Sequence, residues 1–127
     1  MATKHRWDAD VVIIGAGLAG MAAAFDLIAQ PGRRILILDR DHREHLGGMA
    51  KDSFGGVTMF DTPHQRRMRI SDSQELGWQD WQSTAEFEEG DYWPKLWARH
   101  YVEQSIPGIF EWLTGKGLTF FPVIHWV

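Results

Sequence analysis

Apolar residues are concentrated at the start of the chain, where fifteen consecutive positions, residues 11–25, carry no charge. The first four, VVII, form a short β-branched run, which is typical of a parallel strand buried on both faces. Apolar density continues over residues 18–30 and ends at Pro31 and Gly32, which predicts a helix. A second apolar run at residues 34–39 predicts another strand. We therefore expect the chain to open with a strand, a helix and a strand.

The rest of the chain has a different pattern. Residues 73–81 and 92–113 carry aromatic side chains at spacings that favour helices. We expect these side chains, including Tyr92 and Tyr101, to serve mainly in packing, because aromatic rings bury large areas. The last apolar run, residues 118–124, is a candidate third strand.

The glycines inside the first apolar run follow the pattern G-x-G-x-x-G directly after a predicted strand. In that context Gly15 forms the tight turn out of the strand, Gly17 lets the backbone approach a pyrophosphate, and Gly20 lets the helix pack closely. Leu18 and Ala19 open the helix, whose free N–H groups and positive dipole end favour phosphate. The pattern predicts a dinucleotide site.

Asp39 ends the second predicted strand nineteen residues after Gly20. A carboxylate at about this distance binds the ribose hydroxyls of NAD or FAD in such folds. It disfavours NADP, whose 2'-phosphate it would repel, although the neighbouring Arg40 keeps NADP open as an alternative.

Composition narrows the function classes. The net charge is 13 minus 17, or -4, which gives no electrostatic reason to expect nucleic acid as a partner. The chain has no cysteine, which excludes disulfides, metal thiolates and thiol catalysis. His42 and His45 lack further converging ligands, so no metal site is expected. The arginines at 66, 67 and 69 are expected to be a solvated surface rather than an anion site.

The apolar start also has features of an export signal, because basic residues precede it and three alanines stand near its end. Asp8, Asp10 and the scattered glycines argue against that interpretation. The run is also shorter than the roughly 20 residues that cross a bilayer. We expect no transmembrane segment and a cytoplasmic location.

Two glycine doublets follow, Gly47-Gly48 and Gly55-Gly56, separated by 55 minus 47, or 8, positions. With these doublets, the glycine fingerprint and the stretch WLTGKGLTFF, the chain resembles the N-terminal part of a flavoprotein family. That family contains the fumarate reductase and succinate dehydrogenase flavoproteins and the 3-ketosteroid dehydrogenases, and the chain is most similar to its bacterial FAD-binding dehydrogenases. The resemblance implies an α/β fold, the start of a Rossmann-like FAD-binding domain that is incomplete in this chain. Residues 10–60 would form the βαβ unit and flavin loop, and residues 61–127 a mostly helical segment leading toward a substrate or capping region absent here.

The resemblance also implies a set of cofactor contacts. The first doublet would lie near the pyrophosphate and ribityl, and the residues after it would line the flavin, where glycine permits close approach and positive φ angles. The expected FAD-binding residues are Gly15, Gly17, Leu18, Ala19, Gly20, Asp39, Arg40, Gly47, Gly48, Met49, Ala50, Ser53, Gly55 and Gly56.

Membrane-bound members of this family tether the flavin through a histidine six positions before the second doublet. Here 55 minus 6 gives Met49, whose thioether does not form that bond. Since the chain also lacks cysteine, FAD is expected to be held noncovalently.

The expected function is an FAD-dependent oxidoreductase that acts on a CH-CH bond of a bulky or carboxylated small-molecule substrate. No catalytic residue is assigned, because the family supplies its proton-transfer group from later regions. The electron acceptor and the oligomeric state stay open. One alternative is a non-catalytic remnant or interaction module that keeps only the βαβ opening. An NAD-binding dehydrogenase is disfavoured by the two glycine doublets.

Overall fold

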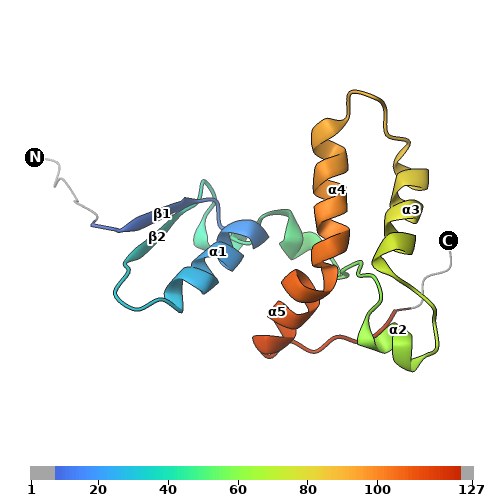
Figure 1. The fold of residues 1–127 in the computed structure, drawn as a ribbon. Coiled ribbons are helices and arrows are strands. Elements are labelled where there is room, and N and C mark those ends of the chain that lie inside the picture. Colours follow the sequence, from blue (N-terminus) through green and yellow to red (C-terminus); the bar gives the residue numbers. More distant parts are fainter. Residues whose placement is uncertain (1–7, 124–127) are drawn as a thin grey trace, which may run out of the picture. The chain divides into compact units, whose positions relative to one another are not determined.

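The computed structural model describes residues 8–123 of the chain (Figure 1). The chain divides into two compact units, Met1–Gly56 and Val57–Val127. The first unit contains a small parallel sheet and one α-helix, and the second is helical.

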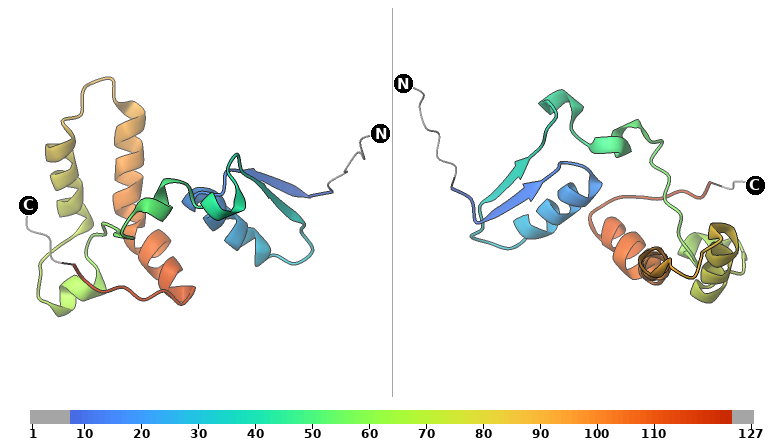
Figure 2. Two further views of the ribbon diagram at one scale, coloured as in Figure 1. Left: turned by 180° about the vertical axis from the view of Figure 1, so that it is seen from behind. Right: turned by 90° about the horizontal axis from the view of Figure 1, so that it is seen from above.

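The first unit begins with the predicted strand, helix and strand. Strand β1 (Val11–Ile14) pairs in parallel with β2 (Ile35–Leu38), with Val11 opposite Ile35 and Ile14 opposite Leu38. Helix α1 (Leu18–Ile28) connects them and lies along one side of the pair (Figure 2). The helix ends two residues earlier than predicted, ahead of the turn at Pro31 and Gly32.

A carboxylate fixes the register at the start of the two strands. Asp10 precedes β1, and its carboxylate accepts hydrogen bonds from the Arg34 backbone N–H at 2.8 Å and from the Arg34 side chain at 3.2 and 3.3 Å. These bonds lower the pKa of Asp10. The pair therefore holds the strand starts together at neutral pH.

Burial of the strands on both faces, expected from the sequence, is wrong for this structure. Side chains of β1 alternate between half-buried and exposed, and Ile14 is 87% exposed. The physical reason is that a single crossover helix covers one face of a two-stranded sheet and leaves the other open. Among residues 8–56 of this unit, the buried apolar ones are Ala16 and Ala24.

The prediction of a third strand is also wrong for the residues that the structure describes. Residues 118–123 carry no strand pairing, and the described residues contain one sheet of two strands. Residue 124 of that prediction lies outside the described range. Instead, the Leu118 N–H donates to the carbonyl of Leu113 at the end of a helix.

The second unit consists of α2 (Pro63–Arg67), α3 (Gln74–Ala85), α4 (Tyr92–Gln104), a π-helical turn η3 (Ser105–Phe110) and α5 (Glu111–Gly115). Helices α3 and α4 run side by side, joined by residues 86–91 (Figure 1). Trp81 and Tyr101 pack between them, as expected, with ring centroids 5.4 Å apart. The prediction of packing is wrong for Tyr92, Trp93 and Trp97, which are 64–69% exposed because they lie on the side of α4 that no described element covers. The short helix α2 was not predicted.

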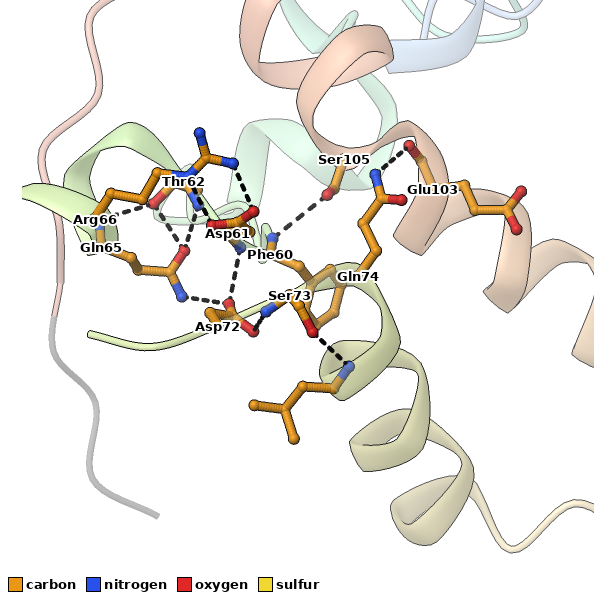
Figure 3. A network of polar contacts seen from close by, with 11 residues as sticks. Phe60, Asp61, Thr62, Gln65, Arg66, Asp72, Ser73, Gln74, Glu103 and Ser105 are labelled. Carbon is orange, nitrogen blue, oxygen red and sulfur yellow. Dashed lines mark hydrogen bonds and ion pairs between the residues drawn. The ribbon is translucent and has the colours of Figure 1, made fainter. Parts of the chain in front are cut away.

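The helix expected over residues 92–113 is interrupted at η3. Pro107 has no N–H to donate to the carbonyl of Glu103, and its ring displaces the regular helical ladder. The side chain of Gln74 donates to that carbonyl instead, at 3.1 Å (Figure 3). The Glu103 carbonyl therefore keeps a hydrogen-bond partner despite the wider turn. The same hydrogen bond links α3 to the end of α4.

No helix within the part of the chain that the structure describes is both long and apolar enough to cross a membrane.

Candidate cofactor-binding site

The turn after β1 leaves no room for a side chain at Gly20. Gly15 has φ +102°, and its N–H donates to the carbonyl of Leu38 at 2.7 Å. A Cβ at Gly20 would lie 1.9 Å from the carbonyl oxygen of Gly15 and 3.3 Å from the Ile13 side chain. Glycine at both positions therefore lets α1 start directly against the strand end.

Gly17 has the opposite surroundings. It caps α1 in extended conformation, with φ -78° and ψ -176°, and a Cβ there would meet nothing within 4 Å. No side chain caps this helix in the structure, and the first N–H groups of a helix lack partners within the helix. Leu18 and Ala19, both exposed, form the open first turn. Open space in front of free N–H groups and a positive dipole end suits an anionic ligand.

The first glycine doublet lies against the fingerprint. The Gly47 N–H donates to the carbonyl of Ala16 at 3.1 Å, and Gly47 pairs with Gly17 in an isolated parallel bridge. A Cβ on Gly48 would lie 3.3 Å from the Cα of Gly17. Gly47 and Gly48 have φ +113° and +58°, which glycine adopts without strain. We call Gly15, Gly17, Gly47 and Gly48 the glycine cluster; it brings together two segments about thirty residues apart.

Asp39 joins the two strand ends beside this cluster. Its carboxylate accepts from the Ala16 N–H at 2.6 Å and from the Asp41 N–H at 2.8 Å. These backbone bonds, with a smaller contribution from the adjacent Arg40, lower the pKa of Asp39 and keep it ionised. Each carboxylate oxygen has two acceptor sites, so the group retains capacity for a further donor such as a ribose hydroxyl.

The second doublet lies in a looser segment. A 3-10 helix, η2 (Gly48–Asp52), carries Met49 and Ala50, of which Met49 is 92% exposed. Ser53 then accepts a local hydrogen bond from the Gly55 N–H at 3.3 Å. Among the described residues, no hydrogen bond found in the structure links Gly55 or Gly56 to the glycine cluster. The structure therefore gathers the fingerprint and the first doublet, but not the second.

Lys51 lies beside the glycine cluster and was not among the predicted site residues. Its ammonium donates to the carbonyl of His45 at 2.9 Å, at the end of the 3-10 helix η1 (Arg43–His45). A Cβ added to Gly47 would lie 3.3 Å from the Cβ of Lys51, so the lysine side chain begins beside the glycine cluster. Its position three residues after a glycine doublet expected to meet a pyrophosphate was the available signal.

The chain is similar to a family of FAD-binding domains and to several known oxidoreductases. The model of the family described as FAD binding domain matches residues 10–126. A KsdD-like steroid dehydrogenase of Mycobacterium tuberculosis is 47% identical over 119 residues, covering 93% of this chain and 21% of that protein. A KsdD-like steroid dehydrogenase of Mycolicibacterium smegmatis is 44% identical over 120 residues, covering 94% of this chain and 22% of that protein.

An NADH:fumarate oxidoreductase of Klebsiella pneumoniae is 33% identical over 109 residues, which is 86% of this chain and 11% of that protein. The chain thus spans about a fifth of the length of the two steroid dehydrogenases it matches. No solved structure matches it.

Proposed function

The chain belongs to the family of FAD-binding domains, whose cofactor is FAD, and we propose that it binds FAD through the glycine cluster and Asp39 as part of a flavin-dependent oxidoreductase. The observation that carries this proposal is the contact between the fingerprint and the first doublet, with Gly47 paired to Gly17. A pyrophosphate needs bare backbone on more than one side, and this pairing supplies it.

The charges around the glycine cluster favour different parts of the cofactor at different places. The N-terminus of α1 attracts the pyrophosphate, and Lys51 adds a cation beside the first doublet. The ionised carboxylate of Asp39 accepts from the ribose hydroxyls of the adenosine half. The same carboxylate repels a 2'-phosphate, so the site favours FAD over NADP.

The flavin half is assigned to the second doublet and its neighbours. Met49, Ala50, Ser53, Gly55 and Gly56 follow the first doublet, and Gly55 has φ +80°. These residues would line the isoalloxazine, where glycine allows the backbone to approach a flat ring. Because Met49 stands in place of the histidine that tethers flavin in membrane-bound members of the family, the cofactor is held noncovalently.

Bound FAD would supply hydride chemistry at a carbon of the substrate. The residues of this chain bind and orient the cofactor, and none is assigned to proton transfer. The relatives are named as steroid dehydrogenases and as an NADH:fumarate oxidoreductase, one bulky substrate type and one dicarboxylate. On that support we propose a CH-CH bond of a bulky or carboxylated small molecule as the site of reaction.

The test is the flavin content of the purified protein. We expect a yellow protein whose supernatant after acid precipitation contains intact FAD at close to one equivalent, identified by chromatography. Flavin that stays with the precipitated polypeptide would contradict the noncovalent site. A colourless protein that takes up no added FAD would contradict the cofactor and favour an interaction module that keeps only the βαβ opening.

A further inference from the structure

The first glycine doublet lies between the 3-10 helices η1 and η2, and a lysine side chain connects these helices across it. Lys51, in the last turn of η2, donates from its ammonium group to the carbonyl of His45 at 2.9 Å. His45 is the last residue of η1. A Cβ added to Gly47 would lie 3.3 Å from the Lys51 Cβ. The lysine side chain therefore starts beside Gly47, after the doublet, and ends at a residue that precedes the doublet.

The segment that leads to the doublet is attached to the turn after β1. Both polar groups of the Ala16 backbone take part in this attachment. The Ala16 N–H donates to Asp39 at 2.6 Å, and the Ala16 carbonyl accepts from the Gly47 N–H at 3.1 Å. Ala16 is 2% exposed. These hydrogen bonds hold residues 39 and 47 against the glycine fingerprint, and neither involves the backbone after Gly47.

The doublet itself has a backbone that is costly to order. Gly47 and Gly48 have φ +113° and +58°, and glycine loses more conformational freedom than any other residue when its backbone is fixed. The hydrogen bond between Lys51 and His45 closes residues 45–51 into a short loop around the doublet. A closed loop has fewer conformations than an open one, so this hydrogen bond reduces the freedom of both glycines.

The charge of the lysine determines how strong this closure can be. Its partner is a carbonyl, and a hydrogen bond from a charged donor is stronger than one between neutral groups. Among residues 8–123, the ion pairs found do not include Lys51. Lys51 is also exposed, so water competes for the ammonium and the net gain is moderate.

We propose that Lys51 is a positioning residue for the pyrophosphate of FAD, which holds the His45 carbonyl and thereby keeps Gly47 and Gly48 against Gly17. This inference rests on the proposed role of the glycine cluster in binding FAD. The lysine acts through the backbone of the doublet, so its effect is present before the cofactor binds. When only a fraction of the molecules has the binding-competent loop, the apparent affinity falls in proportion to that fraction.

The test compares Lys51→Met, which removes the ammonium group and keeps an unbranched apolar side chain, with Arg33→Met. Arg33 is exposed and precedes β2, whereas Asp39 follows the end of that strand, so the control loses the same charge from the other end of the strand. In fluorescence titrations of the purified protein, we expect Lys51→Met to raise the FAD dissociation constant about 2- to 10-fold, the effect of one net hydrogen bond. Arg33→Met should leave this constant unchanged.

Two further measurements separate positioning from a direct contact with the cofactor. In the FAD-free protein, Lys51→Met should speed hydrogen exchange of the Gly47 amide, because the loop opens more often without its closing hydrogen bond. Lys51→Arg keeps the charge and the N–H donors, so it should restore both the FAD affinity and the slow exchange. Both exposed positions tolerate these changes without loss of the fold, which circular dichroism checks.

Equal FAD affinity of Lys51→Met and Arg33→Met would overturn the positioning role. So would a weaker affinity of Lys51→Met with unchanged exchange at Gly47, because the lysine would then act on the cofactor directly. Wild-type protein that binds no FAD would overturn the proposed function as well. Wild-type protein that binds FAD, together with an unaffected Lys51→Met variant, would overturn this inference alone.

Discussion

The contact between α1 and the turn after β1 makes Gly20 the most demanding glycine of the first unit. In Gly20→Ala the new Cβ would lie 1.9 Å from the Gly15 carbonyl oxygen, at least 1.1 Å inside the 3.0 Å limit of real Cβ contacts. That oxygen belongs to backbone in a turn with φ +102°, so it has no flexible side-chain end that could swing away. The strand and the helix must separate to accept the methyl group.

The magnitude follows from two opposing effects. Overpacking of this kind costs about 1–3 kcal/mol, and a clash with backbone belongs at the upper end. Alanine in a helix gains about 1 kcal/mol over glycine. The net expectation is a loss of about 2 kcal/mol in the free energy of unfolding, which is a large share of the stability of a small domain.

The assay is urea unfolding followed by circular dichroism, with the slope checked to be unchanged so that midpoints compare directly. Gly115→Ala is the matched control, because Gly115 is also helical and a Cβ there meets nothing within 4 Å. The control should be neutral or more stable by up to about 1 kcal/mol. A Gly20→Ala protein as stable as wild type would refute the close approach of α1 to the turn.

Two further predictions concern side-chain contacts with backbone N–H groups. Thr62→Ala removes one half of the capping box with Gln65 and should destabilise the helical unit by about 1 kcal/mol in urea unfolding; an unchanged midpoint would contradict the box. The N–H of Ala16 lowers the pKa of Asp39 below its ordinary 3.8, so this contact stabilises the fold above that pH and is lost as the pH falls through the lowered pKa. In an NMR pH titration the Ala16 amide shift should therefore change with a midpoint below 3.8, and a midpoint above it would disprove the bond.

The local sequence pattern was sufficient to predict the first three elements of the fold. The β-branched run, the glycine pattern and Pro31 place β1, α1 and β2 almost at their observed ends. Each of these signals depends on neighbours a few residues apart. The interruption at η3 also had a local signal in Pro107, which the aromatic spacing of the surrounding helix concealed.

Contacts between segments that are far apart in the sequence could not be predicted from local pattern. Nothing near Gly47 specifies that it pairs with Gly17, or that the Ala16 N–H turns toward Asp39. The burial of β1 was predicted wrongly because the residues of a strand do not indicate whether one or both faces of its sheet are covered by other elements. Lys51 was not predicted because a single lysine in a polar loop resembles an ordinary solvated residue.

The pyrophosphate of FAD is expected to approach the backbone at Gly17, and Gly17→Val would block that approach. A Cβ at this position meets nothing within 4 Å, and φ -78° with ψ -176° is open to any residue, so the variant should fold. We expect the circular dichroism of Gly17→Val to match that of the FAD-binding wild type. Fluorescence titration with FAD should nevertheless detect no binding by the variant, because the valine side chain fills the space through which the pyrophosphate approaches. A folded Gly17→Val protein with the wild-type FAD affinity would contradict this prediction.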